Sequence, residues 1–187
     1  MATRFIDKNS SPDTTNTPNL PDAAGICVDD GVLVYNNGSA IVPVNSSGAP
    51  VAVTATTLTV TAASHAGRTV LLSNVAGCAV DLPAATGTGN KYRFFRSAAL
   101  TSGSDVITAL AGDLMAGYAL VEDGGDTTPS DVTLFPAIAA STVIYTDAFT
   151  GGGGDIGNWF EAEDVATDRW MVKGYQASVL DPVTPFS

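Results

Sequence analysis

Short apolar segments alternate with clusters of turn-forming residues along most of the chain. From Val51 to Val60 the sequence VAVTATTLTV places apolar side chains and threonines at alternating positions. Alternation with a period of two, carried by β-branched residues, is typical of a strand with one buried face. The pattern therefore predicts one strand over this segment.

Further short strands follow, and most of the connections between them contain glycine. The predicted strands are Thr69–Leu72, Cys78–Leu82, Tyr92–Phe95, Val106–Thr108, Tyr118–Val121, Val132–Phe135, Thr142–Tyr145 and Trp170–Tyr175. Many short strands spaced roughly 8–12 residues apart are typical of a sandwich or barrel. Only residues 156–165 (IGNWFEAEDV) predict a short helix. We expect an all-β fold, a β-sandwich or barrel of many short antiparallel strands, with at most one short helix.

The N-terminal part of the chain has a different pattern and predicts an arm and a hairpin before the main domain. Residues 1–25 are rich in Asn, Asp, Ser, Thr and Pro, and their prolines exclude a helix. Two alternatives stay open: a disordered tail, or an extended arm that orders on a neighbouring subunit through Arg4, Phe5, Ile6 and Asp7. Residues 26–48 predict a β-hairpin, because Asn37-Gly38 suits a tight turn between two apolar runs. Residues 49–187 form the predicted sandwich or barrel domain.

The charge of the chain argues against nucleic acid as a partner. Its 187 residues include 19 acidic and 8 basic ones, a net charge of −11, and only 14% of the residues are charged. Phosphate binding needs clustered Lys and Arg, yet the nearest approach to a basic patch is Lys91, Arg93 and Arg96. No apolar stretch is long enough for a membrane helix, and MATRFIDKNSSP lacks the apolar region of a secretory signal. We expect a protein made in the cytoplasm, without membrane or nucleic-acid partners.

Residues with reactive side chains are few and form no recognisable catalytic set. His65 is the only histidine and is expected at the surface or in a turn. Cys27 and Cys78 lie in apolar surroundings and are expected to be buried and reduced, with a disulfide or a reactive thiol as the alternatives. The glycine run 151–154 is interpreted as a flexible linker or a long hairpin loop. No catalytic, cofactor-binding or metal-binding residues are predicted, so we expect a protein that is not an enzyme.

Two groups of side chains have a ligand-binding alternative beside the structural one. The acidic groups are expected in solvated turns, with weak Ca²⁺ binding or glycoside hydrolysis as the alternatives; they are Glu122, Asp123 and Asp126, and Glu161, Glu163 and Asp164. Trp159, Phe160, Trp170 and Tyr175 are expected in the core or in a trimer interface, with a sugar-stacking platform as the alternative.

One stretch carries a family resemblance. Residues 78–96, CAVDLPAATGTGNKYRFFR, resemble a pattern of bacteriophage virion proteins, in which Leu-Pro-Ala-Ala-Thr-Gly (here 82–87) leads through a glycine turn into an aromatic strand. The closing segment, from Trp170 to Phe186, is similar to that of the same proteins. The likeness covers residues 50–187 and includes capsid decoration (cement) proteins and tail-fibre proteins.

The resemblance implies a role in the particle rather than a reaction. It implies a homotrimer that binds the major capsid protein on the outer surface of the expanded shell and stabilises it, assembled in the host cytoplasm. The alternative is a tail-fibre or glycan-binding adhesin module. The chain is short and lacks a heptad or repeat, which favours the cement protein. An acidic protein outside a DNA-filled shell has no tendency to bind released DNA.

Overall fold

The structure is a computed structural model. It describes residues 25–29, 32–36 and 41–43 as backbone, and residues 48–123, 131–147, 153–178 and 181–187. The chain divides into two compact units, Met1–Gly48 and Ala49–Ser187. The predicted arm, with Arg4, Phe5, Ile6 and Asp7, lies outside the described residues except for Gly25.

The first unit contains a small antiparallel sheet in the order β1-β2-β3. Its strands are β1 (Gly25–Asp29), β2 (Val32–Asn36) and β3 (Ile41–Pro43). β2 and β3 pair antiparallel on either side of the Asn-Gly position, so the predicted hairpin is confirmed for its strands. Its turn lies outside the described residues.

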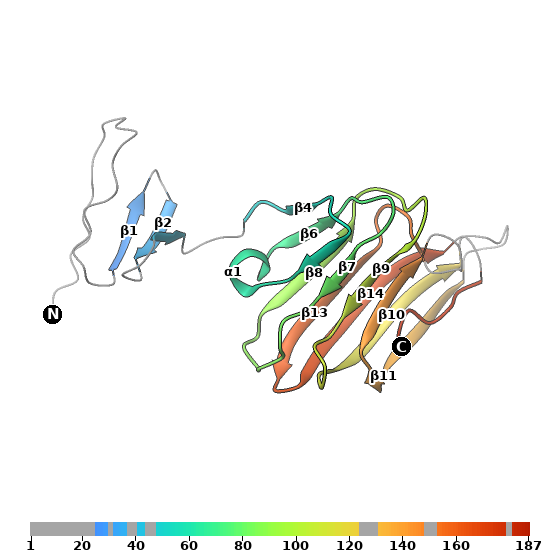
Figure 1. The fold of residues 1–187 in the computed structure, drawn as a ribbon. Coiled ribbons are helices and arrows are strands. Elements are labelled where there is room, and N and C mark those ends of the chain that lie inside the picture. The colour runs from blue at the N-terminus through green and yellow to red at the C-terminus, as the bar shows by residue number, and fades with distance from the viewer. Residues whose placement is uncertain are drawn as a thin grey trace. The chain divides into compact units, whose positions relative to one another are not determined.

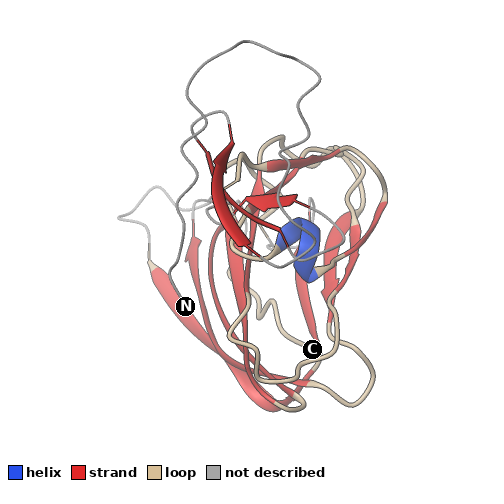
Figure 2. Cartoon of the chain, turned by 90° about the vertical axis from the view of Figure 1, so that its left-hand side faces the viewer, coloured by secondary structure: helices blue, strands red, loops and turns tan. Residues whose placement is uncertain are grey.

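Apart from one four-residue helix, the regular secondary structure described in the second unit consists of strands, which confirms the all-β prediction (Figures 1 and 2). A seven-stranded sheet has the order β11-β10-β14-β13-β8-β6-β4, and a four-stranded sheet has the order β12-β9-β7-β5. The strands are β4 (Val51–Val53), β5 (Thr57–Thr59), β6 (Thr69–Leu72), β7 (Ala79–Asp81), β8 (Lys91–Arg96), β9 (Ser104–Thr108), β10 (Leu114–Asp123), β11 (Val132–Ser141), β12 (Val143–Asp147), β13 (Trp159–Ala166) and β14 (Arg169–Ser178).

The prediction of antiparallel strands holds for only part of the second unit, because several neighbouring strands are parallel. β4, β6 and β8 are parallel neighbours in one sheet, and β5, β7 and β9 are parallel neighbours in the other. The physical reason is the path of the chain, which changes sheet after each strand from β4 to β9. Strands that follow one another therefore do not pair, and strands two apart run in the same direction. β10 and β14 also pair in parallel, over ten residues.

The same change of sheet divides the strand predicted from Val51 to Val60. β4 ends at Val53 and β5 begins at Thr57, and the two belong to different sheets. The backbone between them still has partners, because the Val53 carbonyl accepts a hydrogen bond from the Ser73 N–H and the Thr56 carbonyl accepts one from the Ala79 N–H. Period-two alternation continues across the crossing, so the pattern alone did not reveal it.

The helix predicted over residues 156–165 is also wrong. This segment contains most of β13, which pairs along one side with β8 and along the other with β14. Among the described residues the helix is instead the four-residue α1 (Ala62–His65), drawn in blue in Figure 2. His65 lies in this helix and is buried, which corrects the surface position expected for it. Its Nδ1 accepts a hydrogen bond from the Thr61 N–H at 3.0 Å.

One hydrophobic core is shared by the two sheets of the second unit. The seven-stranded sheet contributes Val70, Phe94 and Trp170, among others, and the four-stranded sheet contributes Val80, Ile107 and Ile144. Burying each large apolar side chain contributes about 1.5–3 kcal/mol, so the inward faces account for much of the stability of the unit. We call the opposite side of each sheet its outer face.

The free edges of both sheets are short, interrupted or covered. β4 and β5 have three residues each, and Pro136 removes a backbone donor from the middle of β11. The C-terminal residues pair along β12: Ser187 accepts hydrogen bonds from the N–H groups of Thr142 and Val143, and Pro185 accepts one from Tyr145. Short edges, edge prolines and covering segments all oppose the addition of a strand from another chain. These edges therefore offer little backbone for pairing with a strand of another chain.

Candidate interaction surface

A continuous row of apolar side chains crosses the outer face of the seven-stranded sheet. Residues that pair directly across neighbouring strands project from the same face of a sheet, so the register defines the neighbours. We call this set the apolar row; from β11 to β4 it consists of Leu134, Leu120, Tyr175, Trp159, Phe95, Leu71 and Ala52. The strands that carry it can be followed in Figure 1.

The apolar row is accessible, especially toward β11. Leu134 is 57% exposed and Leu120 is 36% exposed, whereas Trp159 and Tyr175 at the centre of the row are partly buried by their neighbours. Tyr118 and Met171, at neighbouring outer-face positions, are also exposed. Contiguous apolar side chains of this extent on a sheet face are typical of a binding surface.

Charged side chains border the row and are paired with one another. Lys173 and Glu161 form an ion pair at 2.9 Å, and Lys91 and Glu163 form another at 3.1 Å. The hydrogen bond to Glu161 raises the pKa of Lys173. The guanidinium of Arg93 lies 4.9 Å from the centroid of the Trp159 ring, within the range of a cation–π contact.

Tyr175 joins the row to the acidic residues of β10. Its hydroxyl donates a hydrogen bond to Oε2 of Glu122 on the neighbouring strand. This hydrogen bond, together with burial, raises the pKa of Tyr175. Glu122 was expected in a solvated turn with Asp123 and Asp126; it lies on β10 instead, and Asp126 is outside the described residues.

The outer face of the four-stranded sheet has a different chemistry. From β5 to β9 its paired outward positions are Thr57, Ala79 and Val106 in one row and Thr59, Asp81 and Thr108 in the next, and on β12 these rows end in Tyr145 and Val143. Aromatic residues, Met and Arg are enriched at the centres of protein interfaces. The seven-stranded sheet therefore carries the stronger candidate surface.

The four aromatic residues singled out in the sequence divide between the surface and the core. Trp159 and Tyr175 lie in the apolar row, whereas Phe160 and Trp170 belong to the core. Trp170 is 1% exposed and its Nε1 donates to Oδ2 of Asp113 at 3.3 Å. A sugar-stacking role for Trp170 is therefore wrong, because its ring is not accessible.

The end of the Leu-Pro-Ala-Ala-Thr-Gly motif and the residue after it are held by a buried carboxylate. Oδ1 of Asp164 accepts hydrogen bonds from the N–H groups of Thr86 and Gly87 at 2.9 and 2.6 Å, and Oδ2 accepts from the N–H and hydroxyl of Thr88 at 3.0 and 2.6 Å. Burial raises the pKa of Asp164, but these hydrogen bonds outweigh it and lower the pKa below its usual value. The expectation that Asp164 lies in a solvated turn is wrong, because this side chain is buried on β13 and holds residues 86–88 in place through hydrogen bonds.

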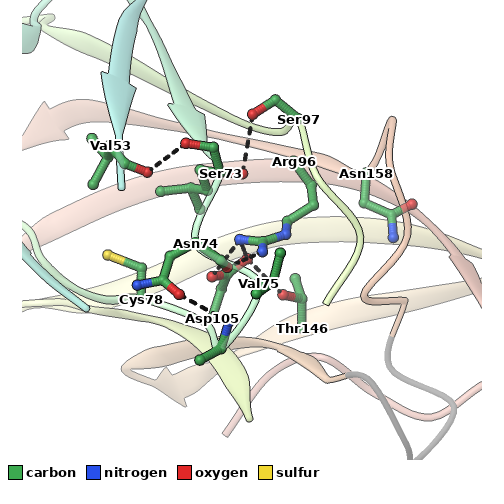
Figure 3. A network of polar contacts seen from close by, with 12 residues as sticks. Val53, Ser73, Asn74, Val75, Cys78, Arg96, Ser97, Asp105, Thr146 and Asn158 are labelled. Atoms are coloured by element: carbon green, nitrogen blue, oxygen red, sulfur yellow. Dashed lines mark hydrogen bonds and ion pairs between the residues drawn. The ribbon is translucent and has the colours of Figure 1, made fainter. Parts of the chain in front are cut away.

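A buried ion pair joins the two sheets. Both oxygens of Asp105 on β9 accept hydrogen bonds from Arg96 on β8, at 3.0 and 3.1 Å, and the Thr146 hydroxyl donates to Asp105 at 3.2 Å (Figure 3). Arg96 also donates to the carbonyl of Asn74. Burial raises the pKa of Asp105, and the ion pair with Arg96 opposes that change. The basic group noted in the sequence is thereby divided, because Lys91 and Arg93 face outward and Arg96 faces inward.

Cys78 is buried, as expected, and its thiol is free. Burial raises its pKa to about 11.

The described residues contain no group of three or more His, Cys, Asp or Glu placed to hold a metal ion. No helix in the described part of the chain is long and apolar enough to cross a membrane. Comparisons with family models, curated proteins and solved structures found no match.

Proposed function

We propose that the protein is a structural component of a phage particle, which binds the outer surface of the capsid as a homotrimer and stabilises the expanded shell. In this proposal the two sheets form the layers of a β-sandwich, and the N-terminal arm contacts the major capsid protein. The role is mechanical: each trimer bridges several capsid subunits, and many modest contacts act together.

The observation that carries the proposal is the apolar row on the outer face of the seven-stranded sheet. The row contains Trp159 and Tyr175, and Arg93 lies beside it over the Trp159 ring; Trp, Tyr and Arg are the residue types that contribute most to binding energy at protein interfaces. Because the sheet edges are short, interrupted or covered, contact through this face is favoured over the addition of a strand at an edge. The capsid as the place of action is supported by the likeness of residues 78–96 to virion proteins.

The capsid-binding part of the proposal can be tested on the arm. Phe5 and Ile6 are its adjacent apolar residues, and replacing both with aspartate (F5D/I6D) removes the apolar anchor. We expect this variant to lose co-sedimentation with expanded, undecorated capsids. The control T14D/T15D adds the same two charges at polar positions of the same segment and should bind as the wild type does. Full capsid binding by F5D/I6D, or by a chain without residues 1–20, would contradict the anchoring role.

The rival function, a glycan-binding module of a tail fibre, also has one observation in its favour. Trp159 and Tyr175 are cross-strand neighbours on an open face, which is a possible platform for a sugar. However, Arg93 already lies over the Trp159 ring, where a pyranose would stack. A glycan array probed with the full-length protein distinguishes the two functions: specific binding that is lost in W159A would favour the adhesin.

A further inference from the structure

The basic residues of the second unit are concentrated on the outer face of the seven-stranded sheet. Residues 49–187 contain six basic and fourteen acidic residues. Four of the six basic residues occupy outer-face positions of β8 and β14, namely Lys91, Arg93, Arg169 and Lys173. Among the described residues, only three acidic ones share this face, namely Glu122, Glu161 and Glu163.

The rest of the unit is strongly acidic by comparison. Away from this face, Arg68 and Arg96 stand against ten acidic residues in the described part of the unit, and Arg96 is buried with Asp105. Two copies of the chain that approach each other through other surfaces bring like charges together, which opposes association. The outer face of the seven-stranded sheet carries little net charge, so copies can meet there without that repulsion.

The size of this face suits a contact between copies. Seven strands at a spacing of about 4.8 Å, over about six residues at about 3.3 Å each, cover an area of about 600 Å² before the relief of side chains is counted. Stable protein interfaces bury about 800 Å² on each partner, which is the same order. The apolar row crosses the whole width of this area and would supply its water-excluding centre.

We infer that the outer face of the seven-stranded sheet is the self-association surface of the protein, and that its occupants are the other copies of this chain in the trimer. The inference deepens the proposed function, on which it rests for the homotrimer, by naming the partner of this face. It leaves the N-terminal arm as the part that contacts the capsid.

The test compares two matched pairs of substitutions in the full chain. L120E/L134E places two carboxylates in the apolar row, and L110E/I156E makes the same change at two apolar residues outside the strands, which are 51% and 63% exposed. Sedimentation velocity over a range of concentrations measures the mass of each. We expect the wild type and L110E/I156E to be trimers and L120E/L134E to be a single chain of 19.0 kDa. Association should weaken by roughly 100-fold or more, about a factor of ten for each anchor.

Trp159 supplies a second measurement that needs no disruptive substitution. If the row is buried between copies, the tryptophan emission of the wild type shifts to longer wavelength when dilution dissociates the trimer. The shift should be absent in W159F, since Trp170 stays in the core of each chain. Circular dichroism checks that L120E/L134E is folded; if it is not, the dilution experiment decides alone.

The outcomes separate the inference from the proposed function. If L120E/L134E is still a trimer, and the tryptophan emission of the wild type does not change on dilution, the inference is overturned. The trimer of the proposed function is then unaffected. A wild type that is a single chain at all concentrations, in solution and on capsids, overturns both. Loss of capsid binding in a trimeric L120E/L134E would assign the face to the capsid instead and also overturn the inference.

Discussion

The carboxylate of Asp164 is the most informative residue to perturb. Asp164→Asn keeps the size of the side chain but leaves one accepting oxygen where the carboxylate has two. The amide group of Asn then faces either the N–H groups of Thr86 and Gly87 or the N–H and hydroxyl of Thr88. Two donors therefore lose their acceptor, and the new N–H₂ group points toward them.

The loss can be estimated from these contacts. A hydrogen bond to a charged group contributes about 1.5–3 kcal/mol. Since the loop can partly rehydrate its freed donors, we expect Asp164→Asn to lower the free energy of unfolding by about 3 kcal/mol at pH 7. Glu163→Gln is the matched control, because Glu163 neighbours Asp164 but pairs with Lys91 at the surface. Exposed ion pairs contribute about 0–1 kcal/mol, so its effect should be small.

Urea unfolding between pH 7 and pH 3 tests both the size and the origin of the effect. The folded state lowers the pKa of Asp164 below the ordinary value of 3.8. A carboxyl group with a lowered pKa stabilises the folded state above its unfolded pKa, and this contribution is lost as the pH falls through the folded pKa. The advantage of the wild type over Asp164→Asn should therefore be full at pH 7 and shrink below pH 3.8. A difference below about 0.5 kcal/mol at pH 7, or one that stays constant down to pH 3, would refute the reasoning.

Three further predictions concern the buried pair, the C-terminal segment and the thiol. Arg96→Met should lower the free energy of unfolding by about 3–5 kcal/mol, because Asp105 stays buried without its cation. In urea unfolding, the double variant R96M/D105L should recover much of that loss. If the losses of the two single substitutions instead add in the double variant, the two residues are not coupled. Deleting residues 185–187 removes the buried Phe186 and uncovers β12, so the melting temperature should fall. Light scattering on heating should rise more in this deletion than in F186A, which leaves the edge covered. Equal scattering by the two variants would show that covering the edge of β12 does not prevent aggregation. In a C27S background, Cys78 should react with a thiol reagent at pH 8 only after unfolding in urea, since burial raises its pKa to about 11, and rapid labelling of the folded protein would contradict its burial.

Much of the strand content was predictable because its signals are local. Thr69–Leu72 was predicted with its observed bounds, and β2 and β3 were predicted from the Asn-Gly pair between two apolar runs. β-branched residues and turn glycines act on the backbone within a few residues, so their effect can be read in short windows.

β13 was missed because its local preferences conflict with its environment. Glu161, Ala162 and Glu163 favour a helix in isolation. In the structure the segment alternates, with Phe160, Ala162 and Asp164 facing inward and the two glutamates facing outward. To recognise that alternation in the sequence, one would have to assume that Asp164 is buried. The hydrogen-bond donors that make its burial possible come from a loop 76–78 residues earlier in the chain, so no local pattern indicates them.

The amino-acid sequence alone determined that the protein is built from strands, where most of them lie, and that one half of a hairpin pairs with the other. Only the tertiary structure decided that successive strands from β4 to β9 enter different sheets, that many neighbours are parallel, and which apolar residues are side by side. The apolar row takes one residue from each of seven strands, and of those residues the sequence singled out Trp159 and Tyr175 but not their neighbours in the row. Backbone pairing between distant segments sets the register, and a shift of one residue would turn each side chain to the opposite face.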